Sequence, residues 1–261
     1  TLYEKDTEMA WLGGMGRGKI GGLSSVLCVT TALAAAGPAS AEERKMLVGS
    51  FEDIQVFGDI NVEILTGKSP TARAIGDKRV LDGLKLERAG MTLRVRLQGA
   101  LNDAKGAPMT GPITVQLTTQ GIKSIAIAGN GRLKISNVAQ SDAVRMLVAG
   151  NGSIAVEKLI TDKFSASIAG NGRIDIKSGN VRDGRVLLDG AGRFDAPNVK
   201  MRTLRLEHNG NAISNVQAME EANIFNRGSG NITVGGSGSC FIKQAGNAAI
   251  NCTRVEKGSR K

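Results

Sequence analysis

The sequence predicts an all-β protein, a parallel β-helix in which coils of about 20 residues stack along one axis. The phrase Ala-Gly-Asn-Gly recurs at a nearly constant spacing, and apolar and polar residues alternate on both sides of each copy. Clear copies occupy residues 128–131, 149–152 and 169–172, and weaker copies follow at 189–192, 208–211, 227–230 and 245–248. One such unit cannot bury its apolar face alone, so the units are expected to stack.

The alternation defines a strand on each side of every turn. Ile125 and Ile127 precede the first turn, and Leu133 and Ile135 follow it. Because the side chains of a strand point alternately to its two faces, these apolar residues are expected to face inward and to form aliphatic rows along the stack. A further apolar position in each repeat predicts a third, shorter side of the coil: Val138, Leu159, Val181, Val199 and Val216.

The Gly-Asn-Gly turn has a backbone cause. A sharp corner needs positive φ, which glycine adopts freely and asparagine tolerates better than most residues. Asn130, Asn151 and Asn171 are therefore expected to lie above one another and to join their side-chain amides into a ladder. A phosphate cradle is the alternative, but it needs a following helix N-terminus and a Lys-Ser/Thr pair, which these turns lack.

Residues 1–41 are predicted to be a leader and a secretory signal that is removed from the mature protein. A basic stretch at 15–19 precedes an apolar run at 20–36, and the small residues Ala39 and Ala41 flank the expected cut. The alternative is an uncleaved membrane anchor, which the short run, diluted by glycine and serine, disfavours. Cleavage predicts an exported protein of a Gram-negative envelope, periplasmic or secreted, with no transmembrane span in its mature form.

The remaining chain divides into a linker at 42–50, one domain at 51–255 and a basic tail at 256–261. Within the domain, 51–97 is expected to be an N-terminal β-rich capping segment, 98–111 a loop and 112–255 the coils. The stretch 80–97 is predicted to be a hairpin around Ala89-Gly90. No helix is expected after residue 41.

Cys240 and Cys252 are the two cysteines after the signal, and export favours a disulfide between them. Two buried free thiols are the alternative. Both cysteines lie in the last coil. The open end of this coil is either modestly capped or an oligomer contact, because an unpaired strand edge can pair with another chain.

Asp175 and Asp195 stand at matching outward positions one coil apart, where two carboxylates could act as the acid and base of a polysaccharide lyase or hydrolase. Arg173 and Arg193 flank them, so a solvated salt-bridge face is the favoured interpretation. His208, the only histidine, is expected at a turn with local hydrogen bonds. No metal site, cofactor or catalytic residue is therefore predicted.

Arg132, Arg173 and Arg193 follow their turns at one register and suggest a basic stripe for an anionic polymer. A solubilising face is the alternative. The net charge of +10 raises encounters with anionic polysaccharide, lipopolysaccharide and nucleic acid without selecting one. Aromatic residues make up only 3% of the chain, which counts against specific stacking on bases.

Four features together resemble the head GIN domain of auto-transporter adhesins: the opening residues 51–62, the segment 81–97, the strand at 112–115 and the Ala-Gly-Asn-Gly coils. The resemblance covers about residues 51–255. It implies a right-handed parallel β-helix, export and adhesion, with no agreed catalytic residues. The resulting hypothesis is a non-catalytic, adhesin-like envelope scaffold that binds anionic glycans, lipopolysaccharide or a cell surface.

Overall fold

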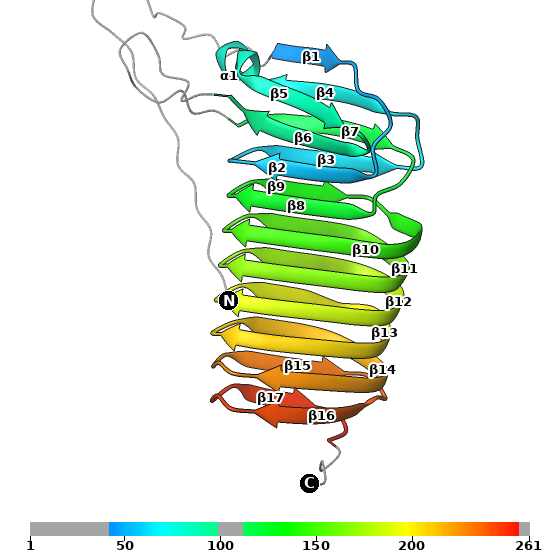
Figure 1. Cartoon of the computed structure of the whole chain (residues 1–261), viewed down its shortest axis with the longest axis vertical. Helices are drawn as coiled ribbons and strands as arrows, with labels where there is room; N and C mark the ends of the chain where they lie inside the picture. The colour runs from blue at the N-terminus through cyan, green and yellow to red at the C-terminus, as the bar shows by residue number, and fades with distance from the viewer. Residues whose placement is uncertain (1–41, 99–111, 256–261) are drawn as a thin grey trace, which may run out of the picture. The chain divides into compact units, whose positions relative to one another are not determined.

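The computed structural model describes residues 42–98 and 112–255. The predicted signal, most of the loop at 98–111 and the basic tail lie outside the described residues. Every described residue belongs to one compact unit, which lies within Ala39–Lys261. Its strands form one 17-stranded sheet that winds into stacked coils (Figure 1), which confirms the predicted β-solenoid.

Five long strands build the middle of the stack: β10 (Val138–Gly150), β11 (Ser153–Gly170), β12 (Arg173–Gly190), β13 (Arg193–Gly210) and β14 (Ile213–Asn226). Each pairs in parallel with the next, as where Ile154 lies opposite Ile174. β11, β12 and β13 each run from one glycine corner to the next, so one bent strand makes a whole coil. The predicted pairs of strands are therefore continuous here.

The predicted third apolar row is only partly correct. Val138, Leu159 and Val199 share one register, but Gly179 occupies that position in β12 and Val181 lies two residues further on. A Cβ at Gly179 would lie 2.0 Å from the Leu159 carbonyl oxygen, so only glycine fits. Val216 instead pairs with Val234, earlier in the coil.

The corners show why the repeat begins with glycine. Gly129, Gly150 and Gly170 have φ angles of 120°, 107° and 111°, a region that disfavours any side chain. A Cβ at Gly150 would also lie 2.8 Å from the Gly129 carbonyl oxygen. That oxygen accepts a hydrogen bond from the Asn151 backbone N–H at 3.1 Å, so the close approach binds one corner to the next.

The interior consists of rows of buried aliphatic side chains that pass from coil to coil. One row runs through Ile127, Val148, Ile168 and Leu188, all at most 1% exposed. Burying a side chain of this kind contributes about 1.5–3 kcal/mol, so the stack depends on these rows. The row then turns polar, because His208 and Asn226 occupy its next two positions.

Residues 51–97 supply both a coil and a cap. The strands β2 (Asp53–Phe57) and β3 (Asn61–Thr66) stack directly on β8 (Ser124–Gly129) and β9 (Arg132–Ile135). The strands β6 (Thr92–Leu97) and β7 (Thr114–Thr119) cover their other edge. The first coil in the chain is therefore second in space, inserted between two later ones.

The cap closes this end with antiparallel strands. β5 (Leu84–Ala89) forms the predicted hairpin with β6, and β4 (Thr71–Gly76) pairs with β7. β1 (Glu42–Met46) pairs with β4, so part of the expected linker is a strand. A short helix, α1 (Lys78–Asp82), was not expected; Asp77 caps it by accepting a hydrogen bond from the Arg79 N–H at 2.9 Å.

The other end of the stack consists of β15 (Asn231–Gly235), β16 (Ser239–Gln244) and β17 (Ala249–Cys252). The predicted Cys240–Cys252 disulfide is present and joins β16 to β17. Beyond these strands, the described chain adds only one bridge, between Cys240 and Val255. No antiparallel cap covers this edge within the described residues.

Candidate functional site

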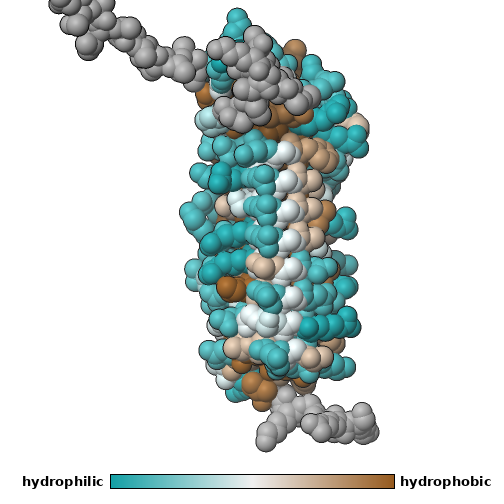
Figure 2. Space-filling model, turned by 90° about the vertical axis from the view of Figure 1, so that its left-hand side faces the viewer, coloured by the Kyte–Doolittle hydropathy of each residue, from teal (hydrophilic) through white to brown (hydrophobic). Residues whose placement is uncertain are grey.

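The turn side of the stack carries the asparagine ladder. The Asn151 Nδ2 donates to the Asn130 Oδ1 at 3.1 Å, and the Asn171 Nδ2 donates to the Asn151 Oδ1 at 3.2 Å. Ala191 interrupts the ladder. Figure 2 views the molecule from this side and shows narrow columns of similar hydropathy running down the coils. Equivalent residues of successive coils thus form continuous outer rows.

Asp175 and Asp195 lie opposite each other on β12 and β13, as their spacing predicts. Both carboxylates are engaged by arginine. The Arg173 Nε lies 2.6 Å from the Asp175 Oδ2, and the Arg193 Nη2 lies 3.1 Å from the Asp195 Oδ2. The hydrogen bond with Asp175 raises the pKa of Arg173. The arrangement is an ion-pair network across two coils, with the carboxylates turned to their own cations.

The predicted arginine stripe is interrupted and partly neutralised. Ser153 stands between Arg132 and Arg173 in the register, and Ile213 follows Arg193. The ion pairs of Arg173 and Arg193 occupy two of its three guanidinium groups. This row therefore carries less unbalanced positive charge than its three arginines alone would give.

His208 is not at the turn, contrary to the expectation. Gly190 pairs with Gly210, so the corner is Asn209-Gly210-Asn211-Ala212, shifted by one residue from the predicted copy at 208–211. A shift of one residue moves a side chain to the other face of a strand. His208 is thus fully buried; its Nε2 lies 3.1 Å from the Ser214 Oγ, and burial lowers its pKa to about 4.

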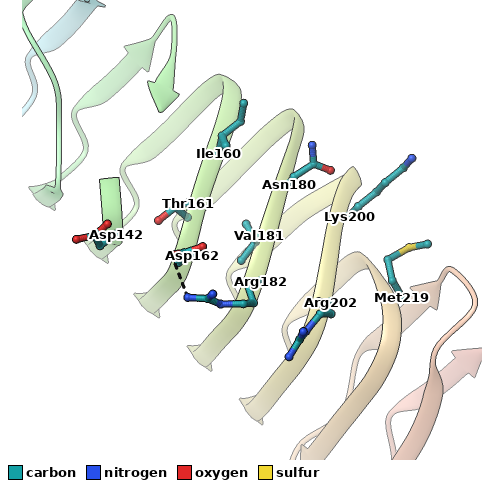
Figure 3. A pocket seen from close by; sticks show the side chains of 10 residues that line it. All are labelled: Asp142, Ile160, Thr161, Asp162, Asn180, Val181, Arg182, Lys200, Arg202 and Met219. Carbon is teal, nitrogen blue, oxygen red and sulfur yellow. Dashed lines mark ion pairs between the residues drawn. The ribbon is translucent and has the colours of Figure 1, made fainter. Parts of the chain in front are cut away.

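A shallow hollow of about 580 Å³ lies on the outer side of β10–β14, where each coil bends away from the turns (Figure 3). Ile160, Asn180 and Lys200 project along one rim from successive coils. Asp162, Arg182 and Arg202 project along the other rim. Thr161 and Val181 form the floor between the two rows, and both are buried. We call this depression the bend hollow.

The bend hollow is acidic at one end and basic at the other. Asp142 and Asp162 lie toward its N-terminal end, whereas Lys200 and Arg202 lie toward its C-terminal end. Arg182 pairs with Asp162 at 3.0 Å, and Arg202 pairs with Glu220 at 3.5 Å. Lys200 makes no ion pair with any residue that the structure describes. A cation in such an open position, beside apolar Ile160 and Met219, can meet an acidic group on a partner.

The sequence analysis missed the bend hollow. The signal that could have revealed it is the outer row Asp162, Arg182, Arg202, which recurs every 20 residues. The row ends at Arg202, because the pairing of β13 with β14 is irregular between Asp195 and Lys200 and between Met201 and Thr203. Across 42–98 and 112–255 the structure brings no three metal-binding side chains together. In the same residues no helix has the length and hydrophobicity that a membrane crossing needs.

The fold is a β-solenoid whose outer faces are built from in-register rows of side chains. A family model described as "Putative auto-transporter adhesin, head GIN domain" matches residues 50–238. The chain belongs to this family, as its opening residues and coils suggested. Comparison with curated proteins gives no match.

Solved structures show the same fold at low sequence identity. A putative adhesin from Bacteroides fragilis is 15% identical with a TM-score of 0.66; the alignment covers 83% of this chain and 95% of that one. A putative lipid binding protein from Parabacteroides distasonis is 20% identical with a TM-score of 0.61, covering 84% and 98%. A putative adhesin from Parabacteroides merdae is 17% identical with a TM-score of 0.60, covering 84% and 98%.

Proposed function

We propose that the protein is an exported, non-catalytic, adhesin-like scaffold that binds anionic polysaccharide or lipopolysaccharide through the outer faces of its coils. The bend hollow is the observation that carries this proposal. It is open along several coils, and it combines apolar Ile160 and Met219 with the cations Lys200 and Arg202. A saccharide chain lying along the stack would place its acidic groups at the basic end.

Binding is favoured over catalysis because the best carboxylate pair is already occupied. Asp175 and Asp195 receive hydrogen bonds from Arg173 and Arg193, so each carboxylate is directed to a neighbouring arginine. An acid–base mechanism needs two carboxyl groups positioned to exchange protons with a substrate. The lyase or hydrolase alternative therefore receives no support from this geometry.

Export rests on the predicted signal at 1–41 and on the family, whose description names an adhesin. Two of the similar structures are described as adhesins and one as a lipid binding protein, and such descriptions agree with a role at the cell envelope. Fractionation of the producing cell distinguishes a periplasmic mature protein from a secreted one.

The proposal is tested by incubating the protein with arrays of glycans and lipopolysaccharides at two salt concentrations. We expect anionic members to bind, with affinity falling as salt rises, because the contacts are charged. Lys200→Glu with Arg202→Glu should weaken binding about tenfold, since two attractive contacts become repulsive.

The matched control is Lys68→Glu with Lys85→Glu, which changes the net charge equally on two exposed lysines outside the bend hollow. It should change binding by less than about twofold. Equal losses of affinity in both double variants would show that net charge alone causes the effect. Absence of binding to every glycan and lipopolysaccharide on the arrays would refute the proposed function.

A further inference from the structure

A second hollow, of about 430 Å³, lies on a different outer face, across β8, β10, β11 and β12. Its lining includes Ser124, Arg145, Lys163, Ser165 and Arg185. Counting all the residues around it, four are basic (Lys123, Arg145, Lys163 and Arg185) and two are acidic (Asp53 and Asp183). We call it the serine–arginine hollow, and it carries a surplus of positive charge.

The hollow arises from alternation of small and long side chains down one outer row. The register places Ser124 above Arg145, Arg145 above Ser165, and Ser165 above Arg185. Neighbouring strands lie about 4.8 Å apart, so the Cα atoms of Arg145 and Arg185 are roughly 10 Å apart with Ser165 midway. Two guanidinium groups therefore border a gap that has a serine hydroxyl at its base.

Two of the cations lack a carboxylate of their own. Within the described residues, neither Arg145 nor Lys163 makes an ion pair. Arg185 donates to the Glu207 Oε1 at 3.1 Å, but that oxygen also accepts from the Arg205 Nε at 2.8 Å. Arg185 thus shares its acidic partner with a second arginine, and Arg145 and Lys163 contribute unbalanced charge.

The acidic residues near the hollow are engaged elsewhere. The Asp183 Oδ1 accepts a hydrogen bond from the Thr203 hydroxyl at 2.8 Å, and its other oxygen lies 3.6 Å from the Arg182 Nε. Asp53 accepts a hydrogen bond from the Thr92 hydroxyl at 3.4 Å. Neither carboxylate forms an ion pair with Arg145 or Lys163, so an added anion meets little competition.

We propose that the serine–arginine hollow binds a phosphate or sulfate ester carried on the anionic glycan. This inference rests on the proposed function, which supplies the glycan. Such a group has three peripheral oxygens, which can accept from Arg145, from Arg185 and from the Ser165 hydroxyl, with Lys163 adding charge. Arginine suits this role because its planar fork donates two parallel hydrogen bonds to an oxyanion.

The lining argues against a nucleic-acid strand. Phe164, the one aromatic residue around the hollow, is only 2% exposed and cannot stack on a base. The row offers only one pair of arginines for an anion, Arg145 and Arg185. The next arginine, Arg205, lies over the Phe225 ring at 4.5 Å and donates a hydrogen bond to Glu207.

The first experiment titrates the full chain with inorganic phosphate and inorganic sulfate by calorimetry at low salt. Arg145→Ala with Arg185→Ala should weaken binding at least about tenfold, and Ser165→Ala by about two- to fivefold. Arg173→Ala with Arg193→Ala removes the same charge from another face and should leave binding within about twofold.

Ser165→Asp guards against loss of fold, because its carboxylate would occupy the gap between the two arginines and exclude phosphate while both arginines stay in place. Thermal melts confirm that each variant is folded. Absence of phosphate and sulfate binding in the parent, or an equal loss in the Arg173 and Arg193 control, would overturn the assignment.

The second experiment separates the sources of the phosphate. Vesicles carrying phosphorylated lipopolysaccharide are compared with vesicles carrying the dephosphorylated form and with the released phosphorylated oligosaccharide. The site predicts that dephosphorylation weakens binding of the parent but not of the Arg145 and Arg185 variant. If that variant keeps full array binding while the Lys200 and Arg202 variant loses it, this inference fails and the proposed function stands.

Discussion

The two ends of the solenoid are closed by different means. At the N-terminal end, β1, β4 and β5 pair antiparallel with their neighbours, and a coil from early in the chain lies between two later ones. At the C-terminal end, the described chain offers β16, β17 and the Cys240–Cys252 disulfide. The N-terminal end is therefore closed by backbone hydrogen bonds between strands that are distant in sequence. The C-terminal end is instead held by a covalent bond.

The interior reinforces this difference. Near the cap the buried side chains are aliphatic except for Thr119, whose hydroxyl donates to the Phe51 carbonyl oxygen at 2.6 Å, whereas His208, Ser214 and Asn226 place three buried polar side chains near the disulfide-linked end. A solenoid is stabilised by contacts between neighbouring coils, so weak coils at one end can open while the rest persists. We therefore expect the local stability of this protein to decrease from its cap toward its disulfide.

The largest expected effect comes from glycine corners. Gly190 has φ of 122°, and a Cβ there would lie 2.5 Å from the Gly170 carbonyl oxygen. Gly190→Ala should lower the free energy of unfolding by about 3 kcal/mol in chemical denaturation. In Gly246→Ala the new Cβ would lie 2.1 Å from the Gly228 carbonyl oxygen, a similar clash. This variant should nevertheless loosen only the last coil and leave the main unfolding transition in place.

Gly121→Ala is the control for both, since a Cβ there meets nothing within 4 Å. It should change stability by less than about 0.5 kcal/mol. A loss of the main transition in Gly246→Ala would contradict the idea that the last coil opens independently.

Acid should weaken the same end. His208 is buried and neutral, and its pKa falls from the ordinary 6.5 to about 4. Between these two pH values the unfolded chain therefore binds a proton at His208 that the folded chain does not bind. The free energy of unfolding has its full value above pH 6.5 and falls as the pH drops toward 4. The loss is about 3 kcal/mol. Denaturation across this range should show it.

His208→Leu continues the aliphatic row of Leu188 and should remove this contribution to the acid sensitivity. An unchanged loss of stability between pH 6.5 and 4 in His208→Leu would assign the effect to other groups.

Reduction of the disulfide should act locally. In the chain-entropy model, opening a loop of this size costs about 2–3 kcal/mol. Cys240→Ser with Cys252→Ser should therefore make the segment from β15 to β17 sensitive to protease, while β10–β13 stay resistant. Cleavage that begins in the cap instead would reverse the proposed order of stability.

The smallest effect concerns the asparagine ladder. Asn151→Ala removes two exposed amide hydrogen bonds and should cost at most about 1 kcal/mol. Ala191→Asn fills the gap in the ladder and should stabilise the middle coils by a few tenths of a kcal/mol. Thermal melts compare the two; destabilisation by Ala191→Asn would count against a ladder that supports the corners.

The coils could be predicted from the sequence because Gly129, Gly150 and Gly170 are required by backbone geometry at a constant spacing. The order of the coils at the cap could not, because Ile54 and Ile125 alternate with polar residues like any strand and meet only in three dimensions. The strand β1, Glu-Glu-Arg-Lys-Met, has no strand-forming side chains of note and exists because β4 offers an edge.

The sites were harder to predict for the same reason. Asp175, Asp195 and the arginines beside them could be placed on one face, because that face follows the repeat. The bend hollow extends to where the register between β13 and β14 slips near Lys200, and the serine–arginine hollow depends on which side chains are short. His208 was misplaced because the weak repeat copy around it is shifted by one residue.

Hydrogen exchange measured by mass spectrometry on the full chain tests the difference between the two ends most directly. We predict slow exchange from β6 and β2 through β8 to β13, and exchange that becomes progressively faster through β14 to β17. Protection that is uniform along the coils, or weakest in the strands of the cap, would contradict this account.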